Sequence, residues 1–385
     1  MNSDIRVLYL VNGHIPNNRA NGVQIAHTCE ALGKQVTLTL ATRMTYVRVE
    51  DSFSRYGIFP TFAHVKIFCI DISKLPFRYV VRNASFFFTA NIYVLGFFIT
   101  NLLHGRKPVL YVRGEVMLSL IPLAYVLPIF FETHQIRNYA WLYRIALRRV
   151  RGIVVVTERL KKKFIEEYNI PAQKILVARD AVDLAKFASA KQNRDVWVRH
   201  GISPEKKIVL YAGTLATEKG VHTLARVATL VSSNVQIVFL GGVLEQVEAF
   251  RRAYGDLKNV SILGRVDYGA VPEYVVSADI LVLPDSGDFT YSNLYTSPMK
   301  LFEYMASKRP IIASDVPSLG EVLDDTTATF FKADSSESLR DAIHYVLSHT
   351  DESEKKAIHA HDVVAGFTWE KRTKSIVAHI LESLK

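Results

Sequence analysis

The sequence contains only two cysteines, Cys29 and Cys69, among its 385 residues. Neither has metal-ligand spacing, and two thiols are too few for the disulfide framework of a secreted domain. No D-x-D pair stands at the end of an expected strand, and no G-x-G-x-x-G follows the first strand. The low cysteine count predicts a reduced, cytoplasmic protein, and the missing glycine fingerprint argues against a nicotinamide-dependent dehydrogenase.

The first residues of the sequence do not resemble a secretory signal peptide. The sequence MNSDIRVLYLV enters a strand directly, with no basic lead and no cleavage site, so we expect no secretory signal. The length of 385 residues exceeds the usual size of one domain, and a hydrophobic content of 49% is enough to form a large buried core. We therefore expect two domains with ample buried core.

Acidic residues are the minority in the first half of the chain. Residues 1–200 carry 28 basic and 13 acidic side chains, whereas the remainder carries 19 and 24. Between Arg137 and Lys163, basic and aromatic residues interleave in a pattern that we interpret as an amphipathic helix suited to an anionic membrane surface. A solvated basic face is the alternative. No nucleic-acid recognition motif accompanies the charge, so we do not expect nucleic acid as a partner.

Convincing apolar runs of bilayer-spanning length, about 20 residues, are missing as well. Phe86–Leu103 and Val116–Phe131 come nearest, but the first contains polar side chains such as Asn91 and the second is divided by Pro122 and Pro128. We interpret both as core helix or strand, with shallow membrane insertion as the alternative. A lipid-linked acceptor would then be met by surface docking.

Short apolar runs alternate with helical patterns, which is the order of a parallel α/β fold. The first half contains RVLYLV, VTLTLA, VKIFCI, VLYVRG, PIFFETH and GIVVVT, and the order restarts with KIVLYAG, VQIVFLGG, VSILGRV, DILVLP and RPIIASD. We expect two Rossmann-like, doubly wound domains, residues 1–190 and 191–365, and a C-terminal helix, residues 366–385, packing towards the first domain. The polar stretch Ala188–Lys207 is the expected linker, and a ligand should lie in the interdomain cleft.

The most informative segment is SPMKLFEYMASKRPIIASDVPSLGEVL, Ser297–Leu323. Ser297 suits an N-cap and Pro298 the first helical position, so unpaired amides of the first turn would attract phosphate. Lys300 adds a positive charge in the same turn. Glu303, about one helical turn or 5.4 Å further on, can accept both hydroxyls of a ribose. The pattern predicts a nucleotide-sugar site.

This segment, together with the turn GTLATEKG at Gly213–Gly220, closely resembles the donor site of the family 4 retaining glycosyltransferases, the glycosyl transferases group 1. The resemblance covers nearly the whole chain and is strongest over 207–323. It implies an α/β GT-B architecture, with an N-terminal acceptor-binding and a C-terminal nucleotide-sugar-binding domain. It also implies metal-independent transfer with retention of configuration.

The chain departs from that family at two positions. The family's first glutamate is Tyr295 here, eight residues before Glu303, so the paired-glutamate motif is half present. Asp285, Asp288 or Tyr291 could take over the contact to the donor sugar. The arginine that often follows the first glycine of the turn is Thr214.

The resemblance assigns both donor-binding and catalytic residues. The nucleobase would be read by backbone groups, and growing charge on the leaving diphosphate would be stabilised by two lysines and the amides after Ser297. The implied donor-binding residues are Gly22, Gly213, Thr214, Lys219, Gly241, Arg265, Val266, Ser297, Pro298, Met299, Lys300 and Glu303. The implied catalytic residues are His134, Lys219 and Glu303.

Two of these residues lie in the N-terminal domain. Gly22, just before a helix expected to begin near Val23, would let the backbone approach a phosphate or sugar, and a plain turn glycine is the alternative. His134 follows the strand PIFFET and resembles the family's histidine that faces the donor sugar. Glu132 should project from the same side of that strand.

The combined expectation is a retaining glycosyltransferase that moves a sugar from a nucleotide sugar, UDP-linked or GDP-linked, to a lipid-linked or polysaccharide acceptor. Its site would be cytoplasmic, at the inner face of the membrane, and it would need no metal or other cofactor. A nucleotide-sugar epimerase or sugar phosphorylase of the same fold is an alternative. A non-catalytic sugar-nucleotide-binding protein is another.

Overall fold

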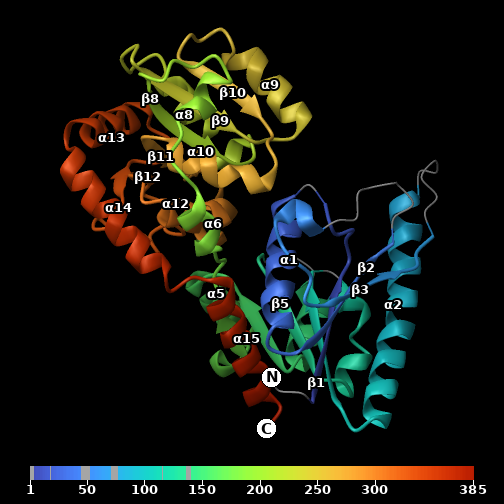
Figure 1. The fold of residues 1–385 in the computed structure, drawn as a ribbon. Coiled ribbons are helices and arrows are strands. Elements are labelled where there is room, and N and C mark those ends of the chain that lie inside the picture. Colours follow the sequence, from blue (N-terminus) through green and yellow to red (C-terminus); the bar gives the residue numbers. More distant parts are fainter. Residues whose placement is uncertain (1–3, 18, 45–52, 71–76, 115, 136–139) are drawn as a thin grey trace. The chain divides into compact units, whose positions relative to one another are not determined.

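The computed structural model describes residues 4–17, 19–44, 53–70, 77–114, 116–135 and 140–385. It forms two compact units: Met1–Arg179 with Trp369–Lys385, and Asp180–Thr368. Figure 1 shows that each unit is a sheet with helices packed around it. The predicted class, two doubly wound parallel α/β domains, is confirmed.

The first unit is built on one parallel sheet in the order β3-β2-β1-β4-β5-β6-β7. Its strands are β1 Ile5–Val11, β2 Thr37–Arg43, β3 Ala63–Ile67, β4 Lys107–Arg113, β5 Ile129–Thr133, β6 Gly152–Val155 and β7 Ile175–Val177. Its helices are α1 Ala20–Gly33, α2 Arg78–Leu103, α3 Val116–Ser119, α4 Ala140–Arg149, α5 Glu158–Tyr168 and α15 Trp369–Ser383, with 3-10 turns η1 Phe53–Tyr56, η2 Leu123–Tyr125 and η3 Ala172–Lys174. The central strands are almost wholly buried because helices cover a parallel sheet on both faces.

The second unit repeats this plan with the strand order β10-β9-β8-β11-β12-β13. Its strands are β8 Lys207–Ala212, β9 Val235–Leu240, β10 Val260–Gly264, β11 Ile280–Leu283, β12 Ile311–Ser314 and β13 Thr329–Phe331. Its helices are α6 Leu184–Ser189, α7 Asp195–Val198, α8 Val221–Val227, α9 Leu244–Tyr254, α10 Val271–Ser277, α11 Thr290–Tyr295, α12 Met299–Ala306, α13 Ser336–Ser348 and α14 Thr350–Val364, with 3-10 turns η4 Thr217–Lys219 and η5 Tyr268–Ala270.

Side-chain alternation along β8 divides the core of this second unit into two layers. Ile208 and Leu210 pack into one hydrophobic cluster, whereas Val209 and Tyr211 pack into another. Successive side chains of a strand point to opposite faces of the sheet, so one short strand supports both layers.

The polar stretch Ala188–Lys207 is not a linker, which corrects the expectation above. It contains α7 and packs within the second unit, where Trp197 is fully buried and donates its indole N–H to the carbonyl of Ser277 at 3.0 Å. Arg194 pairs with Asp279 at 2.9 Å. The chain passes between the units at Arg179 and Asp180, earlier than the boundary expected at residue 190.

The basic segment from Arg137 to Lys163 is not one amphipathic helix. Its described part forms α4, β6 and the start of α5, because the apolar run at Gly152–Val155 is a buried strand. Trp141 is exposed on α4, whereas Tyr143 is buried against Phe131 and Phe164. Residues 136–139 lie outside the described residues.

The expectation of core structure for the two apolar segments is only partly correct. Val116–Phe131 divides into α3, η2 and the buried start of β5. Phe86–Leu103 belongs to α2, which buries one face against β4, β3 and β1 and exposes the other. Among the described residues, α2 is the one helix long and apolar enough to cross a membrane. Figure 1 shows it at the edge of the first unit.

Candidate functional site

The candidate donor site lies at the carboxyl ends of the strands of the second unit. Strand order reverses at β8, because β9 and β10 follow on one side of it while β11 and β12 lie on the other. In open α/β sheets, ligands bind at such a switch point, outside the carboxyl ends of the strands. The loops after β8, β9, β10 and β11 carry most of the sequence-predicted donor residues to this one edge.

Glycines let the loops at this edge approach one another closely. A Cβ at Gly241 (φ 114°) would lie 2.3 Å from the carbonyl oxygen of Gly213, so the loops after β8 and β9 touch there. A Cβ at Gly220 (φ 64°) would lie 1.7 Å from the carbonyl oxygen of Pro284. Only glycine fits both positions, and the backbone is brought close to where a ligand would lie.

Two predicted lysines converge on one buried carboxylate. Lys219, from η4, places Nζ 2.9 Å from Asp285 Oδ1, and Lys300, from α12, places Nζ 3.7 Å from Asp285 Oδ2. Asp285 is 1% exposed and lies two residues after the end of β11. Lys300 Nζ also lies 4.1 Å from the ring centroid of Tyr211. The cluster holds two cations and one anion, an excess of positive charge at the switch point.

Burial lowers the pKa of Lys300 to about 8, because the pairing with Asp285 only partly offsets the lost hydration and Lys219 repels the same charge. Its ammonium therefore loses its proton just above neutral pH unless an additional anion arrives. This behaviour suits a group that binds a charged ligand.

The helix start differs in detail from the expectation. α12 begins at Met299, with Pro298 at the N-cap position and no side-chain cap. The hydroxyl of Ser297 accepts a hydrogen bond from the backbone N–H of Asp180 at 3.2 Å and so ties this turn to the segment that enters the unit. Ser297 is therefore not the N-cap. The amides of Met299 and Lys300 still belong to the first turn, whose N–H groups have no partner inside a helix.

Glu303 lies one turn into α12 and is 7% exposed. Its Oε1 accepts a hydrogen bond from the hydroxyl of Tyr268 at 2.7 Å. Burial raises the pKa of Glu303, and the bond from Tyr268 and the nearby cations Lys186 and Lys300 act against that rise. Tyr268, in η5 after β10, was not predicted from the sequence, because nothing local marks a tyrosine that meets a carboxylate 35 residues away.

The remaining donor residues surround this cluster. Thr214 and Arg265 are exposed, and Val266 is partly buried after β10. Tyr295, which stands where the family has its first glutamate, ends α11 and is partly buried. Of the three substitutes considered for that glutamate, Asp285 pairs with the lysines, Asp288 is exposed, and the side chain of Tyr291 lies outside the described residues.

In the first unit, His134 belongs to a buried polar network centred on Glu132, which is fully buried. His134 Nε2 lies 2.8 Å from Glu132 Oε1, so the two side chains project together, as expected for residues two apart on a strand. Glu132 Oε2 accepts hydrogen bonds from the hydroxyls of Tyr111 at 2.7 Å and Tyr9 at 3.3 Å. Arg113 contacts the other ring nitrogen of His134 at 3.3 Å.

Arg372 completes this network from the far end of the sequence. Its guanidinium lies 2.8 Å from Glu132 Oε1, and the two side chains are 2% and 0% exposed. Burial alone would raise the pKa of Glu132, but Arg372, the hydrogen bond with His134 and the nearby Arg113 hold that pKa well below its usual range. No sequence pattern indicates that α15 supplies this partner. His134 is thus fixed in position by an ionised carboxylate.

Gly22 does not precede its helix. It is the third residue of α1, which begins at Ala20 rather than near Val23. A Cβ there would lie 2.5 Å from Oδ1 of Asn17 and 2.7 Å from the hydroxyl of Tyr56. Close packing of the first loop explains this glycine without a ligand.

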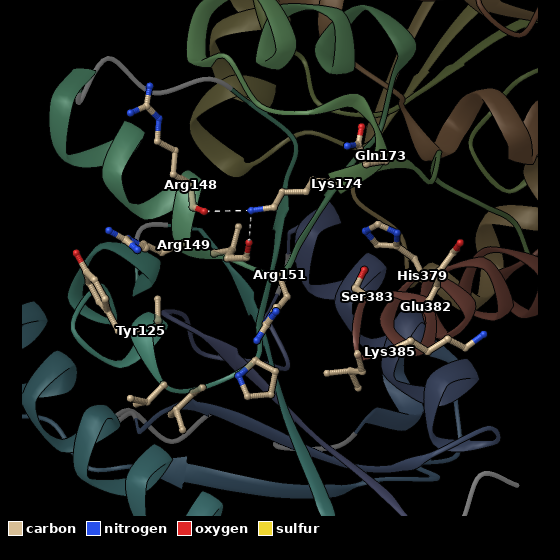
Figure 2. A pocket seen from close by; sticks show the side chains of 16 residues that line it. Tyr125, Arg148, Arg149, Arg151, Gln173, Lys174, His379, Glu382, Ser383 and Lys385 are labelled. Atoms are coloured by element: carbon tan, nitrogen blue, oxygen red, sulfur yellow. Dashed lines mark hydrogen bonds between the residues drawn. The ribbon is translucent and has the colours of Figure 1, made fainter.

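A separate hollow of about 840 Å³ lies at the opposite, amino-terminal edge of the first sheet. Figure 2 shows Arg148 and Arg149 from the end of α4, Arg151 before β6 and Lys174 before β7 around it. Lys174 donates to the carbonyls of Arg148 at 3.1 Å and Val150 at 3.2 Å, and the Arg149 guanidinium lies 4.1 Å from the centroid of the Tyr125 ring. None of the predicted site residues lines this hollow.

No group of three or more His, Cys, Asp or Glu side chains in the described part of the chain is arranged to hold a metal ion. The site of the second unit contains the ammonium groups of Lys219 and Lys300, the backbone amides that begin α12, and the carboxylates of Asp285 and Glu303.

Residues 194–361 match the family model of the glycosyl transferases group 1. The matched range lies within the second unit. Its glycine turn, its lysine pair and the start of α12 all fall inside the matched range. The chain is 26% identical over 228 residues to an alpha-D-kanosaminyltransferase of Streptomyces kanamyceticus, covering 57% of each protein. It is 23% identical over 172 residues to a processive diacylglycerol alpha-glucosyltransferase of Acholeplasma laidlawii, covering 44% of this chain and 49% of that protein.

The matches thus span about half the length of these curated relatives. The whole chain superposes on HepE of Anabaena, solved in complex with UDP-glucose, with a TM-score of 0.71 at 13% identity, covering 98% of this chain and 99% of that one. The fold is therefore that of the GT-B glycosyltransferases.

Proposed function

We propose that this chain is a retaining glycosyltransferase that moves a sugar from a nucleotide sugar, UDP-linked in preference to GDP-linked, to a lipid-linked or polysaccharide acceptor at the inner face of the membrane. The observation that carries the proposal is the pair of lysines, Lys219 and Lys300, held on Asp285 beside the first turn of α12. HepE binds UDP-glucose on the same fold. The diacylglycerol glucosyltransferase named above offers a precedent for a lipid acceptor.

The proposed chemistry follows from where charge grows. Transfer breaks the bond between the anomeric carbon and the diphosphate, and the diphosphate leaves with the bonding electrons. Lys219, Lys300 and the amides of Met299 and Lys300 would bind those oxygens, with Asp285 holding both ammonium groups ready beforehand. These cations do the work that a divalent metal does in other transferases, so we propose transfer without a metal.

The ribose would bind Glu303. A carboxylate offers about four acceptor positions, so the bond from Tyr268 leaves capacity for ribose hydroxyls. The acceptor hydroxyl would attack from the face that the diphosphate leaves and give its proton to a leaving-phosphate oxygen. His134, oriented by Glu132, is proposed to hydrogen-bond the sugar or the acceptor.

The test begins with calorimetric titration of the full chain with UDP, GDP and ADP and their sugar conjugates. Lys219→Ala and Glu303→Ala should each weaken binding by about tenfold or more, because each removes a charged hydrogen-bonding partner. His134→Ala should mainly lower turnover. Lys258→Ala, an exposed lysine before β10, serves as the matched control and should bind like the wild type.

Unchanged donor affinity in both Lys219→Ala and Glu303→Ala would remove the site assignment. A response to phosphate with none to any nucleotide would indicate a sugar phosphorylase. Conversion of the donor sugar without an acceptor would indicate an epimerase. Tight nucleotide binding with no turnover on any acceptor would indicate a non-catalytic binding protein.

A further inference from the structure

The outer face of α2 is apolar along its whole length. From Phe88 onward its large exposed hydrophobic residues recur every three or four positions, and the exposed Ala84 stands midway between Val80 and Phe88. This spacing places them on one face of the helix. We name this set the α2 stripe: Val80, Phe88, Ile92, Leu95, Ile99 and Leu103, with exposed fractions between 40% and 81%. From Val80 to Leu103 the stripe extends for about 35 Å. Soluble monomers rarely expose an apolar surface of this extent unless it binds something.

The opposite face of α2 is fixed to the sheet. Phe86, Ala90, Val94 and Phe98 are buried and face β4, β3 and β1. The hydroxyl of Thr89 donates to the carbonyl of Phe68 at 2.6 Å. A helix held in this way cannot cross a bilayer without leaving its sheet, so whatever covers the stripe meets it from the side.

The neighbouring elements extend the apolar surface. Phe68 and Ile70, after β3, are 54% and 46% exposed beside the first half of α2. α3 contacts both α2 and α4, and α4 exposes Trp141. The same layer of helices ends in Arg148 and Arg149, which line the hollow of Figure 2.

The charges at the two ends of α2 favour one binding partner for the stripe over another. No charged residue occurs in residues 83–103, whereas Arg78 and Arg82 precede this stretch and Arg106 and Lys107 follow it. A second copy docking through the same stripe, parallel or antiparallel, would bring these basic ends against one another, because all four are cationic. An anionic bilayer instead accepts an apolar stripe in its interface and basic side chains among its headgroups.

We infer that the α2 stripe is a membrane-docking surface that lies flat in the interface of an anionic bilayer, with the basic residues at its two ends among the lipid phosphates. This inference deepens the proposed function, since it names the surface by which a lipid-linked acceptor would be reached. It also replaces the predicted basic helix as the principal membrane contact, because the apolar area lies on α2.

The test uses the full chain and vesicles of phosphatidylcholine with or without about 30 mol% phosphatidylglycerol. Ile92→Glu/Ile99→Glu should lower the fraction that floats with anionic vesicles by about tenfold or more. Leu244→Glu is the matched control, a residue of the second unit that is 69% exposed, and should float like the wild type. Equal thermal midpoints of the variants and the wild type establish that folding is unchanged.

Fluorescence of a dye attached to the stripe is a second measurement, and it does not require a variant that has lost vesicle binding. The native cysteines are buried, so an environment-sensitive dye on Ile99→Cys reports that position alone. Its emission should shift to the blue with anionic vesicles, whereas dye on Leu244→Cys should not shift. Flotation of Ile92→Glu/Ile99→Glu equal to the wild type, or no shift at position 99, would overturn the inference.

Light scattering could instead show a dimer that Ile92→Glu/Ile99→Glu converts to monomers. That result would identify a second copy of the chain as the partner of the stripe and would also overturn the inference. Titration of UDP without vesicles separates the two proposals. If UDP does not bind but the stripe variants lose flotation, the glycosyltransferase proposal fails and the docking surface stands.

Discussion

The behaviour of Lys300 illustrates how one buried side chain sets the pH range of a site. Its pKa of about 8 in the folded chain lies below the 10.5 of a hydrated lysine because burial disfavours the ammonium form. Between those two pH values the unfolded chain binds more protons than the folded chain. The contribution of Lys300 to the free energy of unfolding therefore increases as pH rises through this window.

Donor binding should depend on pH in the opposite direction. A diphosphate binds the ammonium form, so the affinity for UDP should fall above pH 8 and approach a tenfold loss for each further unit of pH. Calorimetric titrations between about pH 7.5 and 9.5 measure this slope. Lys300→Met should bind UDP more weakly at neutral pH and show a much flatter slope. A wild-type affinity that does not change over this range would mean that Lys300 does not face the diphosphate.

The local structure around a motif could be predicted from the sequence, whereas the distant partners of its residues could not. Lys219, Lys300 and Glu303 stand in short motifs, so the strand and helix around each were evident from the sequence. Asp285 was considered only as a contact to the sugar, because no pattern reveals that lysines 66 residues before it and 15 residues after it meet there. Tyr268 and Arg372 escaped prediction for the same reason.

At the scale of elements, burial decided which strands could be recognised. β1, β4, β8 and β9 are apolar runs because a central parallel strand is covered on both faces. β7 and β13 have three residues each and stand at the sheet edges, so their runs are too short to be distinguished from a loop. For α2 the sequence left core packing and shallow membrane insertion as alternatives, because length and composition do not distinguish a buried helix from one with an exposed apolar face.

The helix α15 packs against α1 and β6 and contributes one buried ion pair, Arg372 with Glu132, to the first unit. Arg372→Met leaves Glu132 buried without its closest cation and should lower the free energy of unfolding of the first unit by about 3 kcal/mol. Lys374→Met, an exposed change on the same helix, should have little effect. Urea unfolding followed by circular dichroism measures both variants.

The pH dependence of this difference has a definite sign. The pKa of Glu132 is depressed in the folded chain, so the stability from its pairing is fully present above its ordinary value of 4.5 and is lost as pH falls towards the folded-state pKa. The difference in the free energy of unfolding between Arg372→Met and the wild type should therefore become smaller as pH falls. If this difference in the free energy of unfolding stays constant down to the lowest pH at which the protein folds, then packing rather than charge attaches α15.

At the scale of the whole molecule, the chain crosses between its units twice, at Arg179 and again at Thr368, so that both ends of the sequence belong to the first unit. Each unit has its own sheet and its own buried core. The proposed nucleotide site lies entirely in the second unit, whereas the Glu132 network and the α2 stripe lie in the first. Separate cores predict separate responses to ligand and to mutation.

Differential scanning calorimetry of the full chain should therefore resolve two transitions. UDP at about one hundred times its Kd should stabilise the unit that binds it by about 2.7 kcal/mol and raise only that transition. Arg372→Met should lower only the midpoint temperature of the other transition. When UDP is added to Arg372→Met, the two shifts should add. If UDP and Arg372→Met shift the same transition, or if one cooperative transition responds to both, then the two units unfold together and the prediction is wrong.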